Sequence, residues 1–269
     1  MTIDRPTRIG VQILPQHSAT YGPIRDKVLS VEDAGVDVAF NWDHFYPLSG
    51  DPDGYHFECW TMLAAWAEQT ERIEFGALVT SQSYRNPDLL ADMARTVDHI
   101  SAKDGTGRLI LGIGAGWKER DYEEYGYEFG TFGSRLNALA AAMPRIETRW
   151  ERLNPLATRK IPVLIGGGGE QKTLRIVAKH ADIWHSFAND PETLAHKLEV
   201  LKNWGEEVSR DVSEIEVSVG FNAEGRFDAE LLDALWDLGA RFFTIGANGP
   251  DYETPELQKF LDWRDAKNS

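Results

Sequence analysis

An aspartate and a histidine stand side by side where an apolar run ends, in the segment 41–45, Asn-Trp-Asp-His-Phe. A histidine titrates near neutrality, so His44 could donate or accept a proton during a reaction, with Asp43 beside it. Neighbouring residues of a strand point in opposite directions, so we expect one of the two to face a site and the other to fix the loop. A pair that only closes a loop is the alternative interpretation.

Four consecutive glycines form the second candidate for chemistry. They follow the short apolar run 161–165 and precede an apolar pattern with helical spacing. Backbone N–H groups at the start of a helix bind anions, so the run predicts a phosphate cradle. It matches neither the GxGxxG pattern nor the P-loop pattern, and a merely flexible turn stays open. The cradle residues are Gly166, Gly167, Gly168 and Gly169.

A second glycine pattern, Gly-Ile-Gly-Ala-Gly-Trp, occupies residues 112–117. Gly114 and Gly116 would let a flat ligand or another stretch of backbone approach closely. Trp117 begins an aromatic-rich stretch, which either stacks on a planar ring or forms a small core under a loop. The other aromatic residues of this stretch are Tyr122, Tyr125, Tyr127, Phe129 and Phe132.

Metal and covalent chemistry find little support in the sequence. No histidine pair has HxH or HExxH spacing, no GxSxG nucleophile elbow occurs, and no lysine lies inside an expected strand. We therefore predict no metal site. A glycine-lined pocket with a phosphate cradle and one histidine suits a bound organic cofactor that carries out the difficult chemistry.

These residues stand at the ends of apolar runs that alternate with helical patterns. Helices are expected over 87–101, after an Asn-Pro cap, and over 227–238, where Gly239 ends the pattern. The alternation predicts an α/β fold, a (β/α)8 TIM barrel, as a single domain over residues 1–269 with a short insertion region. A doubly wound open sheet is the alternative. The eight expected strands are 8–14, 36–41, 73–80, 108–114, 162–165, 182–185, 215–219 and 241–245.

Composition narrows the range of partners. The chain has 269 residues and a net charge of −15, which argues against nucleic acid or an anionic membrane surface as the main partner. The single cysteine, Cys59, permits no internal disulfide and fits a reducing compartment. Neither an apolar signal segment nor an 18-residue apolar run occurs. We expect a cytoplasmic protein that binds a small molecule.

Taken together, the motifs resemble those of the luciferase-like monooxygenase superfamily, and within it the oxidoreductases that use the deazaflavin coenzyme F420. The resemblance implies that this coenzyme lies at the carboxyl ends of the barrel strands, with its phosphate on the glycine run. It also implies a non-prolyl cis peptide near Leu78, which would bring Val79 and Thr80 against the ring, and His44 near the ring's reactive face. The matching segments, in family order, are 42–45, 76–80 with 84–87, 112–117 and 162–169.

The function implied by the resemblance is hydride transfer between the deazaflavin and a small organic substrate, with His44 as proton donor or acceptor. An FMN-dependent monooxygenase that uses O2, and a flavin-binding protein without a reaction, stay open as alternatives. Sugar-phosphate dehydrogenases of the family carry a tryptophan where this chain has Leu48 and an acid where it has Trp117. Their substrate is therefore not expected here. The segment 132–161 leaves little room for the insertion that is usual in this superfamily. We also expect a homodimer.

Overall fold

A closed barrel of parallel strands forms the centre of the computed structural model, which describes residues 5–221 and 226–269. The strand order is β3-β2-β1-β9-β8-β7-β6-β5-β4, and an additional β3–β5 pairing closes the barrel. Because β3 and β4 are two halves of one interrupted strand, the barrel is eight-stranded, as the sequence predicts. The strands are β1 (Arg8–Ile13), β2 (Val38–Asn41), β3 (Glu74–Ala77), β4 (Thr80–Ser81), β5 (Leu109–Gly114), β6 (Val163–Gly166), β7 (Ile183–Ser186), β8 (Glu216–Gly220) and β9 (Ala240–Ala247).

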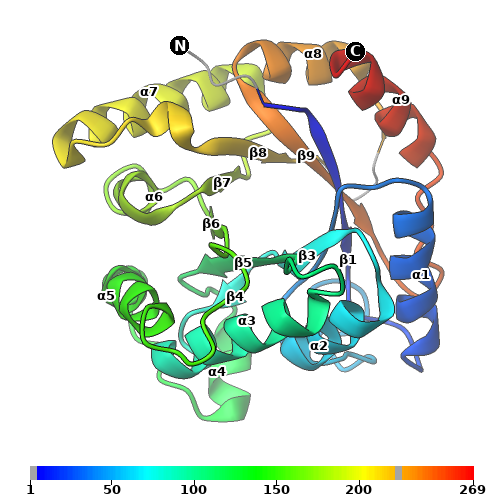
Figure 1. Cartoon of the computed structure of the whole chain (residues 1–269), viewed down its shortest axis with the longest axis horizontal. Helices are drawn as coiled ribbons and strands as arrows, with labels where there is room; N and C mark the ends of the chain where they lie inside the picture. The colour runs from blue at the N-terminus through cyan, green and yellow to red at the C-terminus, as the bar shows by residue number, and fades with distance from the viewer. Residues whose placement is uncertain (1–4, 222–225) are drawn as a thin grey trace.

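Helices surround the barrel on its outer side (Figure 1). Among them α5 occupies most of the segment 132–161, where the sequence leaves little room for an insertion, and α4 is a short additional helix between β5 and α5. None of the helices in the described ranges is long and apolar enough to cross a membrane. The helices are α1 (Gly22–Asp33), α2 (Cys59–Gln69), α3 (Pro87–Ser101), α4 (Glu119–Tyr125), α5 (Phe132–Trp150), α6 (Thr173–His180), α7 (Pro191–Val208), α8 (Ala229–Asp237) and α9 (Leu257–Lys267), with the short 3-10 helix η1 (Val212–Glu214).

Both specific helix predictions are confirmed. The helix expected over 87–101 is α3, and the Asn86 side chain caps it by accepting a hydrogen bond from the Asp88 amide. The helix expected over 227–238 is α8, and Gly239 follows it with a φ of +105°, a conformation that favours glycine. The single domain predicted over 1–269 includes residues 1–4 and 222–225, which lie outside the described residues.

Apolar side chains fill the barrel and the layer around it. One cluster lies inside the barrel and includes Phe40, Ile110, Leu164 and Phe242. A larger cluster packs the outward-facing strand residues against the helices. This division follows from the alternation of side chains along each strand, and it leaves the carboxyl ends of the strands free to carry polar residues.

The barrel strand that consists of β3 and β4 is interrupted between these two halves. The interruption contains a cis peptide bond between Leu78 and Val79, as the resemblance implies. The Val79 side chain lies over the glycines of the neighbouring strands. A Cβ atom added at Gly114 would lie 2.7 Å from Val79 Cγ2, and one added at Gly166 would lie 3.1 Å from Val79 Cγ1. A Cβ added at Gly112 would lie 1.9 Å from the Ala77 carbonyl oxygen. The β5 glycines therefore make room for other parts of the protein, which is one of the two alternatives left open by the sequence.

Replacing Gly112 with alanine should reduce the free energy of unfolding by about 1–3 kcal/mol, because the new methyl group would meet backbone that cannot move aside. Urea denaturation measures this loss. Gly22→Ala is the matched control, since a Cβ there would meet only Thr20 Oγ1, at 3.8 Å. Equal stability of the two variants would contradict the close approach of β3 and β5.

Candidate functional site

A cavity of about 480 Å3 opens at the carboxyl ends of the strands, a size typical of small-molecule sites. It brings together ten of the eleven residues that the sequence singles out, namely Asp43, His44, Val79, Thr80, Gly116, Trp117, Gly166, Gly167, Gly168 and Gly169. The remaining lining residues are Gln12, Trp42, Leu48, Leu78, Ser81, Tyr84, Ala115, Phe132, Leu136, Leu139, Thr173 and Phe187.

Two residues near the cavity do not line it. Gly114 lies beneath the Val79 side chain, so we no longer expect it to contact a cofactor directly. His185 is buried in the barrel, where its Nδ1 atom lies 2.9 Å from Ser218 Oγ. Burial lowers the pKa of His185 to about 4, so this ring is neutral near pH 7. His185 does not line the cavity, but its ring packs against Phe187, which does.

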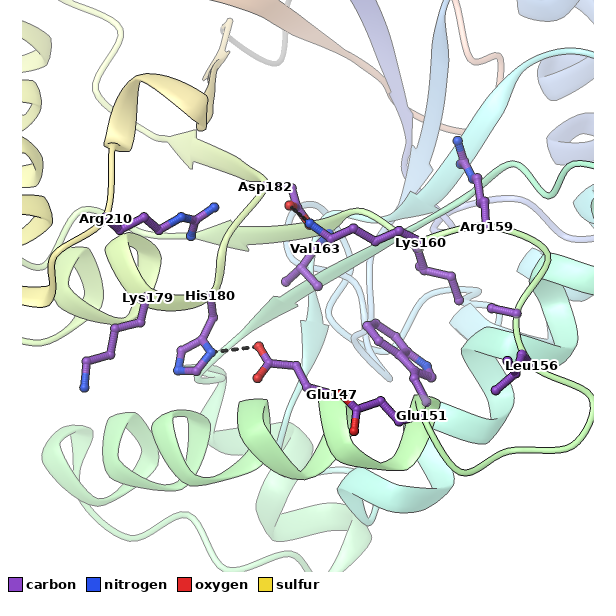
Figure 2. Close-up of a pocket in the computed structure, with 13 residues that line it drawn as sticks. Glu147, Glu151, Leu156, Arg159, Lys160, Val163, Lys179, His180, Asp182 and Arg210 are labelled. Atoms are coloured by element: carbon purple, nitrogen blue, oxygen red, sulfur yellow. Dashed lines mark hydrogen bonds and ion pairs between the residues drawn. The ribbon is translucent and has the colours of Figure 1, made fainter.

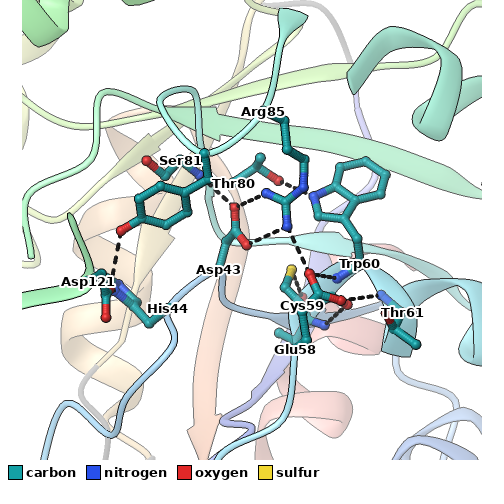
Figure 3. A network of polar contacts seen from close by, with 12 residues as sticks. Asp43, His44, Glu58, Cys59, Trp60, Thr61, Thr80, Ser81, Arg85 and Asp121 are labelled. Carbon is teal, nitrogen blue, oxygen red and sulfur yellow. Dashed lines mark hydrogen bonds and ion pairs between the residues drawn. The ribbon is translucent and has the colours of Figure 1, made fainter. Parts of the chain in front are cut away.

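Asp43 is held by a buried ion pair with Arg85 (Figure 3). Arg85 Nη1 donates to Asp43 Oδ2 at 2.6 Å and Nη2 donates to Oδ1 at 3.1 Å, while the Ser81 amide donates to Oδ2 at 3.0 Å. Burial raises the pKa of Asp43, and the Arg85 charge and these hydrogen bonds oppose that rise. Through these hydrogen bonds the Asp43 carboxylate joins the loop after β2 to Ser81 of β4 and to Arg85, which precedes α3. These bonds are typical of a residue that fixes the loop.

His44 points to a different partner, Asp121 of α4 (Figure 3). The distance between His44 Nδ1 and Asp121 Oδ2 is 2.6 Å. The His44 ring also packs edge-on against Trp42 and Trp117, with centroid separations of 5.7 and 5.6 Å. Since Nδ1 is bonded to Asp121 and Nε2 has no hydrogen-bond partner in the described ranges, Nε2 is the ring nitrogen available to a ligand. Sequence reasoning missed Asp121, because an acid in a short helix four residues after Trp117 carries no distinctive pattern.

The glycine loop supplies backbone donors, but not in the way the sequence suggests. Helix α6 begins only at Thr173, so the loop is a turn before the helix and not the first helical turn. Gly167 has a φ of +127°, and its amide already donates to the His185 carbonyl at 3.1 Å. In the part of the chain that the structure describes, the amides of Gly168 and Gly169 donate to no backbone acceptor. These two amides are the donors left for an anion.

The aromatic stretch after β5 divides into two groups, one that packs as a small core and one that lines the cavity. Tyr125 stacks on Phe45 at 3.9 Å, and Tyr122 is fully buried against Phe129 and Tyr127. Tyr122, Tyr127 and Phe129 form a small core under the loop, whereas Tyr125 is 55% exposed and packs on Phe45 at the surface. Trp117 and Phe132 instead line the cavity with about 60% of their surface exposed, beside the 66% exposed Phe187 that sequence reasoning missed. Their exposed faces are suited to stacking on a planar ring.

A larger groove of about 650 Å3 lies at the opposite end of the barrel (Figure 2). It is formed by the last turns of α5 and α6 and by the residues that precede β6 and β7. Two ion pairs lie within it, His180 with Glu147 and Lys160 with Asp182. Because the amino-terminal face of such barrels serves stability, we place the chemistry in the smaller cavity.

Comparison with known proteins identifies the family. The sequence model of the luciferase-like monooxygenase family matches residues 5–235. The chain belongs to this family. An F420-dependent glucose-6-phosphate dehydrogenase of Amycolatopsis mediterranei is 30% identical over 183 residues, which is 60% of this chain and 51% of that protein. An uncharacterised protein of Mycobacterium tuberculosis is 27% identical over 166 residues, 54% of this chain and 57% of that protein. The chain thus spans about half the length of the curated relatives it matches.

Solved structures of other proteins share the barrel. An F420-dependent secondary alcohol dehydrogenase in complex with an F420-acetone adduct superposes with a TM-score of 0.77 at 17% identity, covering 92% of this chain and 95% of that one. An EDTA monooxygenase from Chelativorans superposes with a TM-score of 0.75 at 12% identity, covering 98% of this chain and 94% of that one. At these identities the likeness establishes the fold.

Replacing Arg85 with methionine should reduce the free energy of unfolding by about 3–5 kcal/mol, because Asp43 would be left as a buried, unpaired charge. Chemical denaturation at pH 7 gives the value. Arg145→Met serves as the control, since the ion pair of Arg145 with Asp88 is exposed and should contribute about 1 kcal/mol or less. A loss for Arg85→Met no larger than that of the control would contradict the role of this ion pair.

Proposed function

We propose that this chain transfers a hydride between the deazaflavin coenzyme F420 and a small organic substrate, with His44 as proton donor or acceptor. The observation that carries the proposal is a single cavity that joins His44 to the open amides of the glycine loop, with Val79 and Thr80 also on its wall. The names of the Amycolatopsis relative and of the alcohol dehydrogenase support the choice of coenzyme.

The residues present fit such a coenzyme. The Gly168 and Gly169 amides would hold its phosphate, and a Cβ at Gly169 would lie 2.8 Å from Thr173 Oγ1, so a side chain there would crowd the cradle. Val79 would support the ring system, and the exposed faces of Trp117 and Phe187 would cover it. When bound, the coenzyme supplies or accepts the hydride. His44 would hold or release the matching proton at Nε2.

The lining of the cavity favours an uncharged substrate. Among the described residues that line it there is no lysine or arginine, and its one carboxylate, Asp43, is paired with Arg85. Apolar side chains, including Leu48, Leu136 and Leu139, make up much of the rest. A phosphate group on the substrate would find no cationic partner among them. We therefore propose an uncharged alcohol or carbonyl compound, unlike the sugar phosphate in the name of the Amycolatopsis relative.

An FMN-dependent monooxygenase is the second candidate. Two backbone amides can bind the phosphate of either coenzyme, and a monooxygenase shares the barrel at a TM-score of 0.75. A flavin-binding protein without turnover is the third. The expected homodimer also stays a prediction, which analytical ultracentrifugation tests directly.

Titrating the protein with F420 and with FMN, followed by visible absorption, should show tighter binding of F420. Gly168→Asp should weaken F420 binding at least about tenfold, because it places a carboxylate beside the phosphate. The fold should not change, because the nearest atom to a Cβ at this position is Lys197 Cε, at 3.9 Å. Gly168→Ala is the control and should bind nearly as well as the unmodified protein. Absence of F420 binding would overturn the proposal, and O2 consumption with reduced FMN would favour the monooxygenase.

A further inference from the structure

We infer that Asp121 is a positioning residue that fixes His44 in the tautomer protonated at Nδ1, so that Nε2 exchanges the proton with substrate. This inference rests on the proposed function. It concerns a residue that lies outside the cavity lining and acts through another side chain.

Asp121 is completely buried and accepts hydrogen bonds from three donors. Its Oδ2 atom lies 2.6 Å from His44 Nδ1 and accepts from the Tyr84 hydroxyl at 3.2 Å, while Oδ1 accepts from the Phe45 amide at 3.3 Å. An ionised carboxylate can only accept hydrogen bonds, so the proton of this first contact belongs to His44 Nδ1. In a neutral imidazole the other nitrogen, Nε2, is then the acceptor.

The Tyr84 hydroxyl reinforces this assignment. Burial raises the pKa of Tyr84, and the nearby Asp121 charge raises it further, so the phenol keeps its proton and remains a donor. Tyr84 therefore donates a hydrogen bond to Asp121 without transferring its proton to the carboxylate. With the amide of Phe45 as a second fixed donor, the carboxylate has one orientation, and this orientation sets that of the imidazole.

Two indole rings that contact His44 limit its rotation. Trp42 and Trp117 pack against it at nearly perpendicular angles of 88° and 72°. A 180° flip of the ring would break the bond to Asp121 and leave a buried carboxylate short of a donor, which is unfavourable. The imidazole is thus held in one orientation before any substrate arrives, which is how an acid–base residue contributes without reorganisation.

The fixed orientation of the His44 imidazole matters because Nε2 takes up or releases the proton in the proposed reaction. When an alcohol is oxidised, its O–H bond breaks and the proton passes to His44 Nε2. The hydrogen of the carbinol carbon leaves with its electron pair as hydride to the coenzyme, and a carbonyl group forms. His44 is then an imidazolium whose positive charge lies beside the Asp121 carboxylate. In the reducing direction the same proton returns from Nε2 to the carbonyl oxygen.

A double-mutant cycle on the full chain tests the inference. Asp121→Asn should lower kcat by about a hundredfold or more, because the amide can reverse the tautomer, while KM and the F420 dissociation constant change by less than about threefold. His44→Ala should cause a loss at least as large, and the double variant should be no slower than His44→Ala alone. Glu124→Gln, an exposed carboxylate of the same helix, is the control and should keep wild-type kcat.

Two outcomes of the cycle would overturn the inference: unchanged kcat in Asp121→Asn, or losses that multiply in the double variant, as expected if Asp121 only maintained the fold. Failure of the unmodified protein to bind F420 would instead count against the proposed function. A second measurement does not depend on turnover or on the variant folding. Nitrogen-15 NMR of the unmodified protein should show that the neutral imidazole of His44 carries its proton at Nδ1, and the opposite tautomer would overturn the inference.

Discussion

Two adjacent side chains in the loop after β2 bond to different partners, and the site depends on what holds each of them. Asp43 is bonded to Arg85 from the loop before α3, and His44 is bonded to Asp121 of α4. One dipeptide therefore connects the segments that follow β2, β4 and β5. Any change in the path of one of these segments would be transmitted to the position of the imidazole, because each connection is a short bond between buried groups.

Burial strengthens the hydrogen bonds of Asp43 and Asp121, and it also requires that both carboxylates have enough donors. A carboxylate removed from water is destabilising unless donors surround it, and removing one donor costs more than the pair itself contributes. Asp43 meets this requirement through Arg85 and the Ser81 amide, and Asp121 through His44, Tyr84 and the Phe45 amide. The aromatic core around Tyr122 and Tyr127 keeps water away from Asp121. The small core and the polar site are thus one structural unit.

The regular part of the molecule could be predicted from the sequence because strand and helix periods are local. Even the Asn86 cap and the turn at Gly239 follow from neighbouring residues. The partner of His44 could not be predicted, because the segment 119–124 contains four acidic residues, and only the packing of α4 decides which of them reaches the histidine. Likewise, the sequence could not tell which glycines face a ligand and which face Val79, since that depends on the path of the chain between β3 and β4.

The position of Val79 has a consequence for how relatives of this protein can diverge. One side chain occupies space that residues 114 and 166 leave empty, so the three positions share a single volume. A side chain at 114 would require Val79 to shift, a side chain at 166 would crowd it, and a smaller residue at 79 would relieve both contacts. The floor of the cavity is therefore shaped by three positions together, and we expect substitutions at 79, 114 and 166 to accompany one another among homologues.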